Sequence, residues 1–93
     1  MSTRTCPSFP LGQIVATPNA LAQITQADIM TALLRHTVGD WGELDTEDKL
    51  TNDRAVVDGT RILSAYRAAN GTKFWIITDA GGLSTTILLP EDY

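Results

Sequence analysis

Apolar positions in the first forty residues predict one short strand followed by two helices. Residues 11–16 have the β-branched content typical of a strand. Thr17 followed by Pro18 is a helix-start signal, because the threonine hydroxyl caps free N–H groups and proline fits the first helical turn. A second helix is predicted to begin after Thr25, another N-cap, and to end at Gly39. Its apolar stripe at helical spacing comprises Ile29, Met30, Leu33 and Leu34.

A third helix is predicted to begin at Asp45, an N-cap followed by acidic residues that suit the positive end of a helix. Gly59 is expected to end this helix, since glycine readily adopts the left-handed conformation found there. Leu50 and Val57, together with Arg54, are expected to mark the inner edge that packs on the rest of the protein.

The rest of the chain alternates in the manner of three strands, over residues 61–68, 72–78 and 83–89. We therefore predict an α+β fold with a short N-terminal strand, two to three helices, and then a three-stranded antiparallel meander with the helices packed on one face. The chain has 93 residues, which is enough for one small core. Residues 9–93 are expected to form this single domain behind a loose leader, residues 1–8.

Asn70-Gly71 is the signal for a hairpin turn between the first two of these strands. A two-residue turn of type I′ needs positive φ at both central residues, which asparagine and glycine tolerate. This turn would pair Tyr66 with Trp75, so we expect both side chains on one face of the sheet. Helices cover only one sheet face, and the other is expected either to meet a partner or to be covered by the first strand or by the loop that holds Trp41.

Composition excludes several classes of protein. Hydrophobic residues make up 43% of the chain and charged residues 19%, which is the balance of a globular domain. No apolar run approaches the ~18 residues that a membrane span needs. Cys6 is the single cysteine, so no intrachain disulfide can form, and no apolar stretch of a secretion signal follows Arg4. We expect a soluble, cytoplasmic protein.

Acidic residues are concentrated in one segment of the chain. Residues 40–58 carry seven acids and two bases, a net charge of −5, whereas the whole chain carries −4. Such a segment steers a protein toward a basic protein surface and away from nucleic acid. The expected partner-binding residues are Asp40, Trp41, Glu43, Asp45, Glu47, Asp48, Asp53, Tyr66 and Trp75. The alternative is a solvated helix face with ordinary caps, and a Trp41 that simply fills the core.

Several kinds of chemistry find no support in the sequence. One histidine, one remote cysteine and scattered carboxylates do not have the ligand spacing of a zinc or calcium site. Gly81-Gly82 follows a strand, but no Lys-Ser or Lys-Thr comes after it, so a nucleotide loop is not predicted. We expect no metal and no cofactor.

A catalytic alternative comes from the order of the elements. Arg35-His36 at a helix end, followed by three antiparallel strands, resembles the superfamily of small metal-independent ribonucleases that includes barnase, ribonuclease colicins and RelE-like toxins. The resemblance implies that His36 is the acid–base residue, that Arg35 or Arg61 stabilises the phosphorane, and that Thr86 is a sheet-borne hydroxyl. The acidic net charge and a last strand without lysine or arginine depart from that pattern.

A second resemblance covers residues 9–93. The strings that carry it are FPLGQIVATP from Phe9, RH at Arg35, GDWGEL from Gly39, ED at Glu47, NDRA from Asn52, RILSAY from Arg61, NGTK from Asn70, IIT from Ile76 and TTILLPEDY from Thr85. The chain resembles a family of small bacterial proteins carried on plasmids and prophages. That origin implies an accessory protein of a mobile element and no particular chemistry.

Together these observations predict a non-enzymatic protein that binds a host protein or complex through its acidic surface. The expected partner has a basic surface of the kind that binds nucleic acid, while direct binding to nucleic acid or to a membrane is not expected. Small acidic proteins of mobile elements often inhibit host defence, so an anti-restriction or anti-CRISPR role is the interpretation we carry forward. The third alternative is a homodimer that uses the uncovered sheet face.

Overall fold

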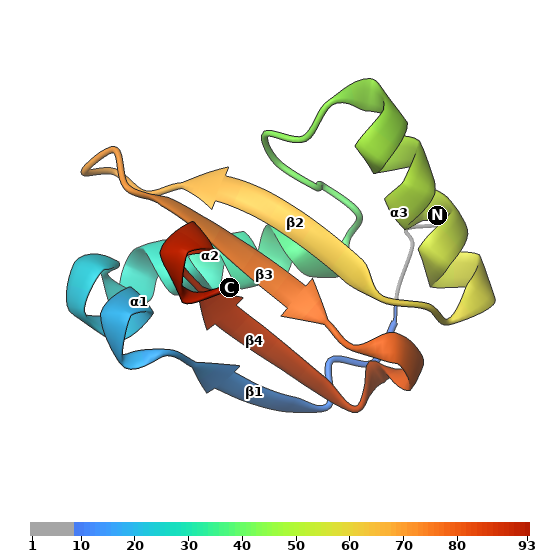
Figure 1. Cartoon of the computed structure of the whole chain (residues 1–93), viewed down its shortest axis with the longest axis horizontal. Helices are drawn as coiled ribbons and strands as arrows, with labels where there is room; N and C mark the ends of the chain where they lie inside the picture. The colour runs from blue at the N-terminus through green and yellow to red at the C-terminus, as the bar shows by residue number, and fades with distance from the viewer. Residues whose placement is uncertain (1–8) are drawn as a thin grey trace, which may run out of the picture.

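One mixed sheet organises the computed structural model, which describes residues 9–93 (Figure 1). Within this range the sheet has four strands, in the order β1-β4-β3-β2. Their bounds are β1 Gln13–Ala16, β2 Ile62–Arg67, β3 Lys73–Thr78 and β4 Ser84–Leu88. Three helices accompany it, α1 Pro18–Gln23, α2 Gln26–Thr37 and α3 Thr46–Asp58. The predicted α+β class is confirmed, and the expected boundary at residue 8 concerns a leader outside the described residues.

The predicted three-stranded antiparallel meander is wrong, because the N-terminal strand joins the same sheet. β1 runs parallel to β4, while β4, β3 and β2 pair antiparallel. The Gln13 N–H donates to the Leu83 carbonyl at 3.2 Å, and the Thr17 N–H donates to the Ile87 carbonyl at 3.0 Å. Three helices and two strands separate β1 from β4 along the chain. A long connection of this kind allows two strands to pair in parallel, and the local sequence of β1 does not reveal that pairing.

The hairpin turn also differs from the prediction, and the difference moves the register by one residue. Only Gly71 has positive φ in this turn, so the type I′ geometry, which needs two such residues, does not form. Instead the Ala68 N–H donates to the Thr72 carbonyl, and Ala69, Asn70 and Gly71 make a three-residue loop. Tyr66 is therefore opposite Phe74, and Trp75 lies on the other sheet face, opposite Ala65.

The helices begin where the sequence places their caps. Thr17, Thr25 and Asp45 each accept a hydrogen bond from a first-turn N–H, at 3.1, 3.2 and 2.8 Å. Gly59 ends α3 with φ of 74°, as expected for a left-handed cap. Local sequence therefore determines these boundaries directly.

Each sheet face has its own cover. One face packs against α1 and α2 in a core that includes Ile24, Leu33, Phe74, Ile76 and Ile87. In Figure 1 the C-terminal turn lies over the other face, in front of β3. There the Tyr93 ring packs edge-on against Trp75, with centroids 5.6 Å apart. The face that the sequence left uncovered is thus partly covered by the chain's own last residues.

Helix α3 is oriented differently from the prediction. Leu50 is 62% exposed and Val57 is 84% exposed, so these residues and Arg54 face solvent and do not form the inner edge. Asn52 and Ala55 are buried instead, in contact with the β2 edge and with a small cluster around Trp41 and Ile62. The buried face of α3 carries a polar residue and a small residue, so the apolar periodicity predicted the wrong face of this helix.

Candidate functional site

The β2 edge and helix α3 form the end of the molecule where most of the expected partner-binding residues lie. Two of the expected acids are engaged in ion pairs there. The Arg35 guanidinium lies 2.8 Å from Asp40, and the Arg67 guanidinium lies 3.3 Å from Glu43. The Arg35 partner also lowers the pKa of Asp40 below its ordinary value. Asp40 and Glu43 therefore contribute less to an acidic surface than their charges alone imply.

Trp41 lies in the core and not on the surface. Its side chain is 3% exposed, its ring packs near His36 and Phe9, and its Nε1 donates to Asp53 at 2.9 Å. Asp53 thereby holds the tryptophan in place, and Asp45 caps α3. Trp41 is therefore not exposed to a partner, and Asp45 and Asp53 each accept a hydrogen bond that holds the local fold.

Tyr66 and Trp75, which were expected to share a partner-binding face, are separated by the sheet. Tyr66 is buried, and its hydroxyl donates to the Asp40 carbonyl at 2.7 Å. Burial raises the pKa of Tyr66 to about 12, so the hydroxyl stays protonated. Trp75 is half-buried beneath Tyr93 on the other face.

The outward face of α3 is what remains available. Leu50, Arg54 and Val57 lie along this face at helical spacing, and Glu47 and Asp58 flank them. A hollow of about 350 Å³ on the same face is lined by Glu47, Leu50, Thr51 and Arg54. From Asp45 to Asp58 the segment carries five acids and two bases, a net charge of −3. In the described part of the chain, no side chain forms an ion pair with any of these acids.

His36 is the most buried polar side chain of α2, and it joins the helix to the sheet. The ring is 0% exposed. Its Nδ1 is 2.5 Å from the Ser64 hydroxyl, and its Nε2 is 2.9 Å from the Thr78 hydroxyl. The Thr78 hydroxyl contacts that of Thr85 at 2.8 Å, and Thr85 donates to the Leu11 carbonyl at 2.8 Å. We call these four side chains the His36 network.

The end of the His36 network fixes the direction of the hydrogen bonds between the Leu11 carbonyl and His36 Nε2. The Leu11 carbonyl can only accept, so Thr85 donates to it and must accept from Thr78. Thr78 has then used its proton, and it accepts from His36 Nε2. His36 therefore carries a proton on Nε2, and in the neutral ring the Ser64 hydroxyl donates to Nδ1. Burial lowers the pKa of His36 to about 4, which keeps the ring neutral near pH 7.

The residues of the ribonuclease alternative are not brought together. His36 lies on the helix-covered side of the sheet, whereas Thr86 points to the opposite side from its network neighbour Thr85. Arg61 donates to the Tyr93 hydroxyl and lies over that ring. Arg35 lies over the Tyr66 ring and pairs with Asp40. The arrangement gives this alternative no support, since both nitrogens of the fully buried imidazole already have partners.

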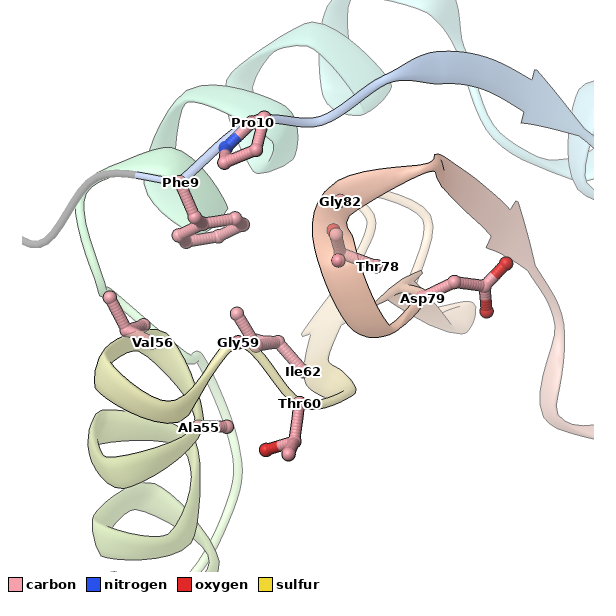
Figure 2. Close-up of a pocket in the computed structure, with 11 residues that line it drawn as sticks. Phe9, Pro10, Ala55, Val56, Gly59, Thr60, Ile62, Thr78, Asp79 and Gly82 are labelled. Atoms are coloured by element: carbon pink, nitrogen blue, oxygen red, sulfur yellow. The ribbon is translucent and has the colours of Figure 1, made fainter.

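A small pocket of about 170 Å³ lies between the end of α3, the turn after β3 and the segment before β1. Figure 2 shows the Phe9 ring beside Ile62 and the end of α3, with the Asp79 carboxylate pointing away from them. Of the three polar side chains that line this pocket, Thr78 belongs to the His36 network and Asp79 accepts from Ser84 at 2.7 Å, which leaves the exposed Thr60 hydroxyl. The pocket therefore offers little beyond apolar contact.

In residues 9–93, no group of three or more histidine, cysteine, aspartate or glutamate side chains gathers in a way that could hold a metal ion. Likewise, no helix of this part of the chain is both long and apolar enough to span a bilayer. Cys6 lies outside the described residues.

The sequence did not indicate two sets of buried polar side chains in this region. The buried Asn52 amide and the hydroxyls of Ser64, Thr78 and Thr85 hold the β2 edge and α2 in place. A usable signal was the alternation in the strands, where these three hydroxyls occupy the positions of core-facing residues.

Comparison with known proteins leaves the function to be argued from the structure. No protein-family model, curated protein or solved structure matches this chain. The resemblance to proteins of plasmids and prophages consequently stays a prediction.

Proposed function

We propose that this protein is a non-enzymatic binding protein whose α3 surface engages a basic surface on a host protein complex. The observation that carries the proposal is the outward face of α3, where exposed Leu50 and Val57 stand beside the carboxylates of Glu47 and Asp58. Two large apolar side chains on one exposed helix face are costly to leave in water, and a partner would bury them.

The charges around this face indicate the chemistry of the partner. With a net charge of −3 over Asp45–Asp58, the surface attracts lysine and arginine and repels phosphates. Basic surface patches are typical of proteins that bind nucleic acid. The protein would occupy such a surface and exclude the nucleic acid from it. A role as an inhibitor of a defence system, of anti-restriction or anti-CRISPR type, is the form of this function that we favour.

Burial and local hydrogen bonds favour a smaller set of contact residues for this proposal. Trp41 and Tyr66 are buried, and Asp45 and Asp53 hold the local fold, so these residues support the surface. The expected direct contacts are Glu47, Leu50, Val57 and Asp58.

A capture experiment with matched variants tests the proposal. The full chain is immobilised and exposed to a lysate of its natural host, and the captured proteins are identified by mass spectrometry. We expect one nucleic-acid-processing complex, lost at high salt and displaced when duplex DNA or RNA is added as a competitor. Asp58→Lys and Leu50→Ser are expected to abolish or strongly reduce capture.

Glu91→Lys provides the control for charge. Glu91 is exposed in the C-terminal turn, and its side chain has no partner within residues 9–93. Glu91→Lys changes the net charge by the same amount as Asp58→Lys, but at a position outside α3. The proposal predicts full capture by this variant. Capture that survives Asp58→Lys and Leu50→Ser, or that is insensitive to nucleic acid, would overturn it.

A further inference from the structure

We propose that the free edge of β1 pairs with the same edge of a second copy of this chain. In the parallel ladder, the N–H groups of Gln13 and Thr17 point toward β4. The backbone groups of the alternate residues, Ile14 and Ala16, therefore point away from the sheet. No group within residues 9–93 bonds to them on that side. An unpaired strand edge of this kind is a template for another strand.

The surface beside this edge is apolar. A groove of about 420 Å³ runs between β1 and the helices α1 and α2. Its lining contains one polar side chain, Gln26, and no charged one. On its rim Ile14 is 49% exposed and Met30 is 51% exposed. Whatever covers this groove must itself be uncharged.

A second copy of the chain would satisfy both the unpaired β1 edge and the uncharged groove. Two β1 edges related by a two-fold axis would pair antiparallel, so the outward groups of Ile14 and Ala16 satisfy those of the partner strand. The two apolar grooves would then lie beside one another and exclude water together. A single continuous sheet through both copies would result.

The charge distribution permits this contact although each chain carries −4. β1 and α1 contain no charged residue. The acids are concentrated on α3, and Figure 1 shows α3 beyond β2, across the sheet from β1. Joining two copies at β1 therefore places the acidic surfaces at the far ends of the dimer, where salt screens their repulsion. Both α3 surfaces stay free, so the dimer does not depend on the proposed function.

Sedimentation velocity of the full chain, from low micromolar to submillimolar concentration, tests the proposal. We expect the wild type to sediment as a dimer at the upper concentrations. Ile14→Lys places an ammonium group in the groove and should raise the dimer dissociation constant by more than about tenfold. Met30→Lys, at the opposite rim, should do the same, and circular dichroism shows whether each variant is folded.

Thr46→Lys is the matched control, because it adds the same charge at an exposed position of α3, away from β1. It should dimerise like the wild type. A wild type that stays monomeric over the whole concentration range would overturn the proposal. So would a dimer that persists in a folded Ile14→Lys or Met30→Lys variant.

Discussion

The two edge strands of the sheet, β2 and β1, differ in whether their outward backbone groups are hydrogen-bonded. At the β2 edge, the Ala65 N–H donates to the Trp41 carbonyl at 3.1 Å and the Ala65 carbonyl accepts from the Glu43 N–H at 2.7 Å. Two residues earlier in β2, the Leu63 carbonyl accepts from the Asn52 side-chain amide, and the Leu63 N–H donates to the oxygen of that amide. The β1 edge has no such cover within residues 9–93. One edge is closed and lies beside charged residues, and the other is open and uncharged.

This contrast shows how a small domain can separate two kinds of contact. Closing the β2 edge prevents strand addition at the end that carries the acids, so binding there must use side chains of α3. The open β1 edge offers backbone groups and an apolar groove, which suit a strand. The groups that close β2 also position α3, and damage to them should affect stability before it affects binding.

The largest expected effect comes from reopening the closed edge at Gly42. Gly42 has φ of +78°, and an added Cβ would collide with the Ala65 carbonyl. Gly42→Ala should lower the free energy of unfolding by about 3 kcal/mol, from the left-handed backbone and from lost edge hydrogen bonds. Chemical denaturation measures this change.

Gly59→Ala is the control for Gly42→Ala. Gly59 has nearly the same φ, +74°, but nothing lies within 4 Å of its added Cβ. Its cost should be limited to the conformational penalty, about 1 kcal/mol. Equal losses in the two variants would show that the edge contact contributes nothing.

Acid should weaken the link between the helix layer and the sheet. Because the pKa of His36 is lowered from 6.5 to about 4, the unfolded chain binds the proton more tightly than the native one. Stability is therefore complete above pH 6.5 and falls between pH 6.5 and 4, by about 3 kcal/mol in total. Urea denaturation at a series of pH values measures the slope.

Replacement of the titrating group checks the assignment of this slope. His36→Gln should remove most of the pH dependence in that interval. Asp40 and Asp92 have pKa values below their ordinary 3.8, so their stabilisation is lost only at lower pH. If the dependence of stability on pH were unchanged in His36→Gln, a group other than His36 would be responsible for it.

A smaller effect is expected from the Asn52 amide. Asn52→Ala removes two hydrogen bonds to Leu63 at a position that is 5% exposed, which should cost about 2 kcal/mol. Thr51→Ala, on the neighbouring exposed position, should cost less than about 0.5 kcal/mol. If the two variants were equally stable, the β2 edge would not need the amide.

The local features of the fold were predictable from the sequence, and the long-range ones were not. Thr17, Thr25, Asp45 and Gly59 act within one helical turn, so the residue type alone identifies a helix end. The pairing of β1 with β4 joins positions about seventy residues apart and leaves no local trace. The predicted hairpin register is wrong because Asn70 keeps negative φ, so only Gly71 has the positive φ that a type I′ turn needs at both central residues.

The candidate site shows the same division. The acidic segment was visible as composition, but ion pairing of Asp40 and Glu43 depends on Arg35 and Arg67 from other elements. The buried Trp41 ring donates its Nε1–H to Asp53, which lies twelve residues further along the chain in α3. Leu50 and Val57 were expected inside because they are apolar, and their exposure became evident only from where α3 packs.

The measurement that tests the central claim most directly is the salt dependence of Kd for the captured partner complex. Wild type, Asp58→Lys and Glu91→Lys are compared at a series of salt concentrations. We predict that the wild type and Glu91→Lys share one steep dependence, and that Asp58→Lys binds at least about tenfold more weakly at low salt with a shallower dependence. A wild-type Kd that does not change with salt, or equal weakening by Asp58→Lys and Glu91→Lys, would contradict binding through the α3 surface.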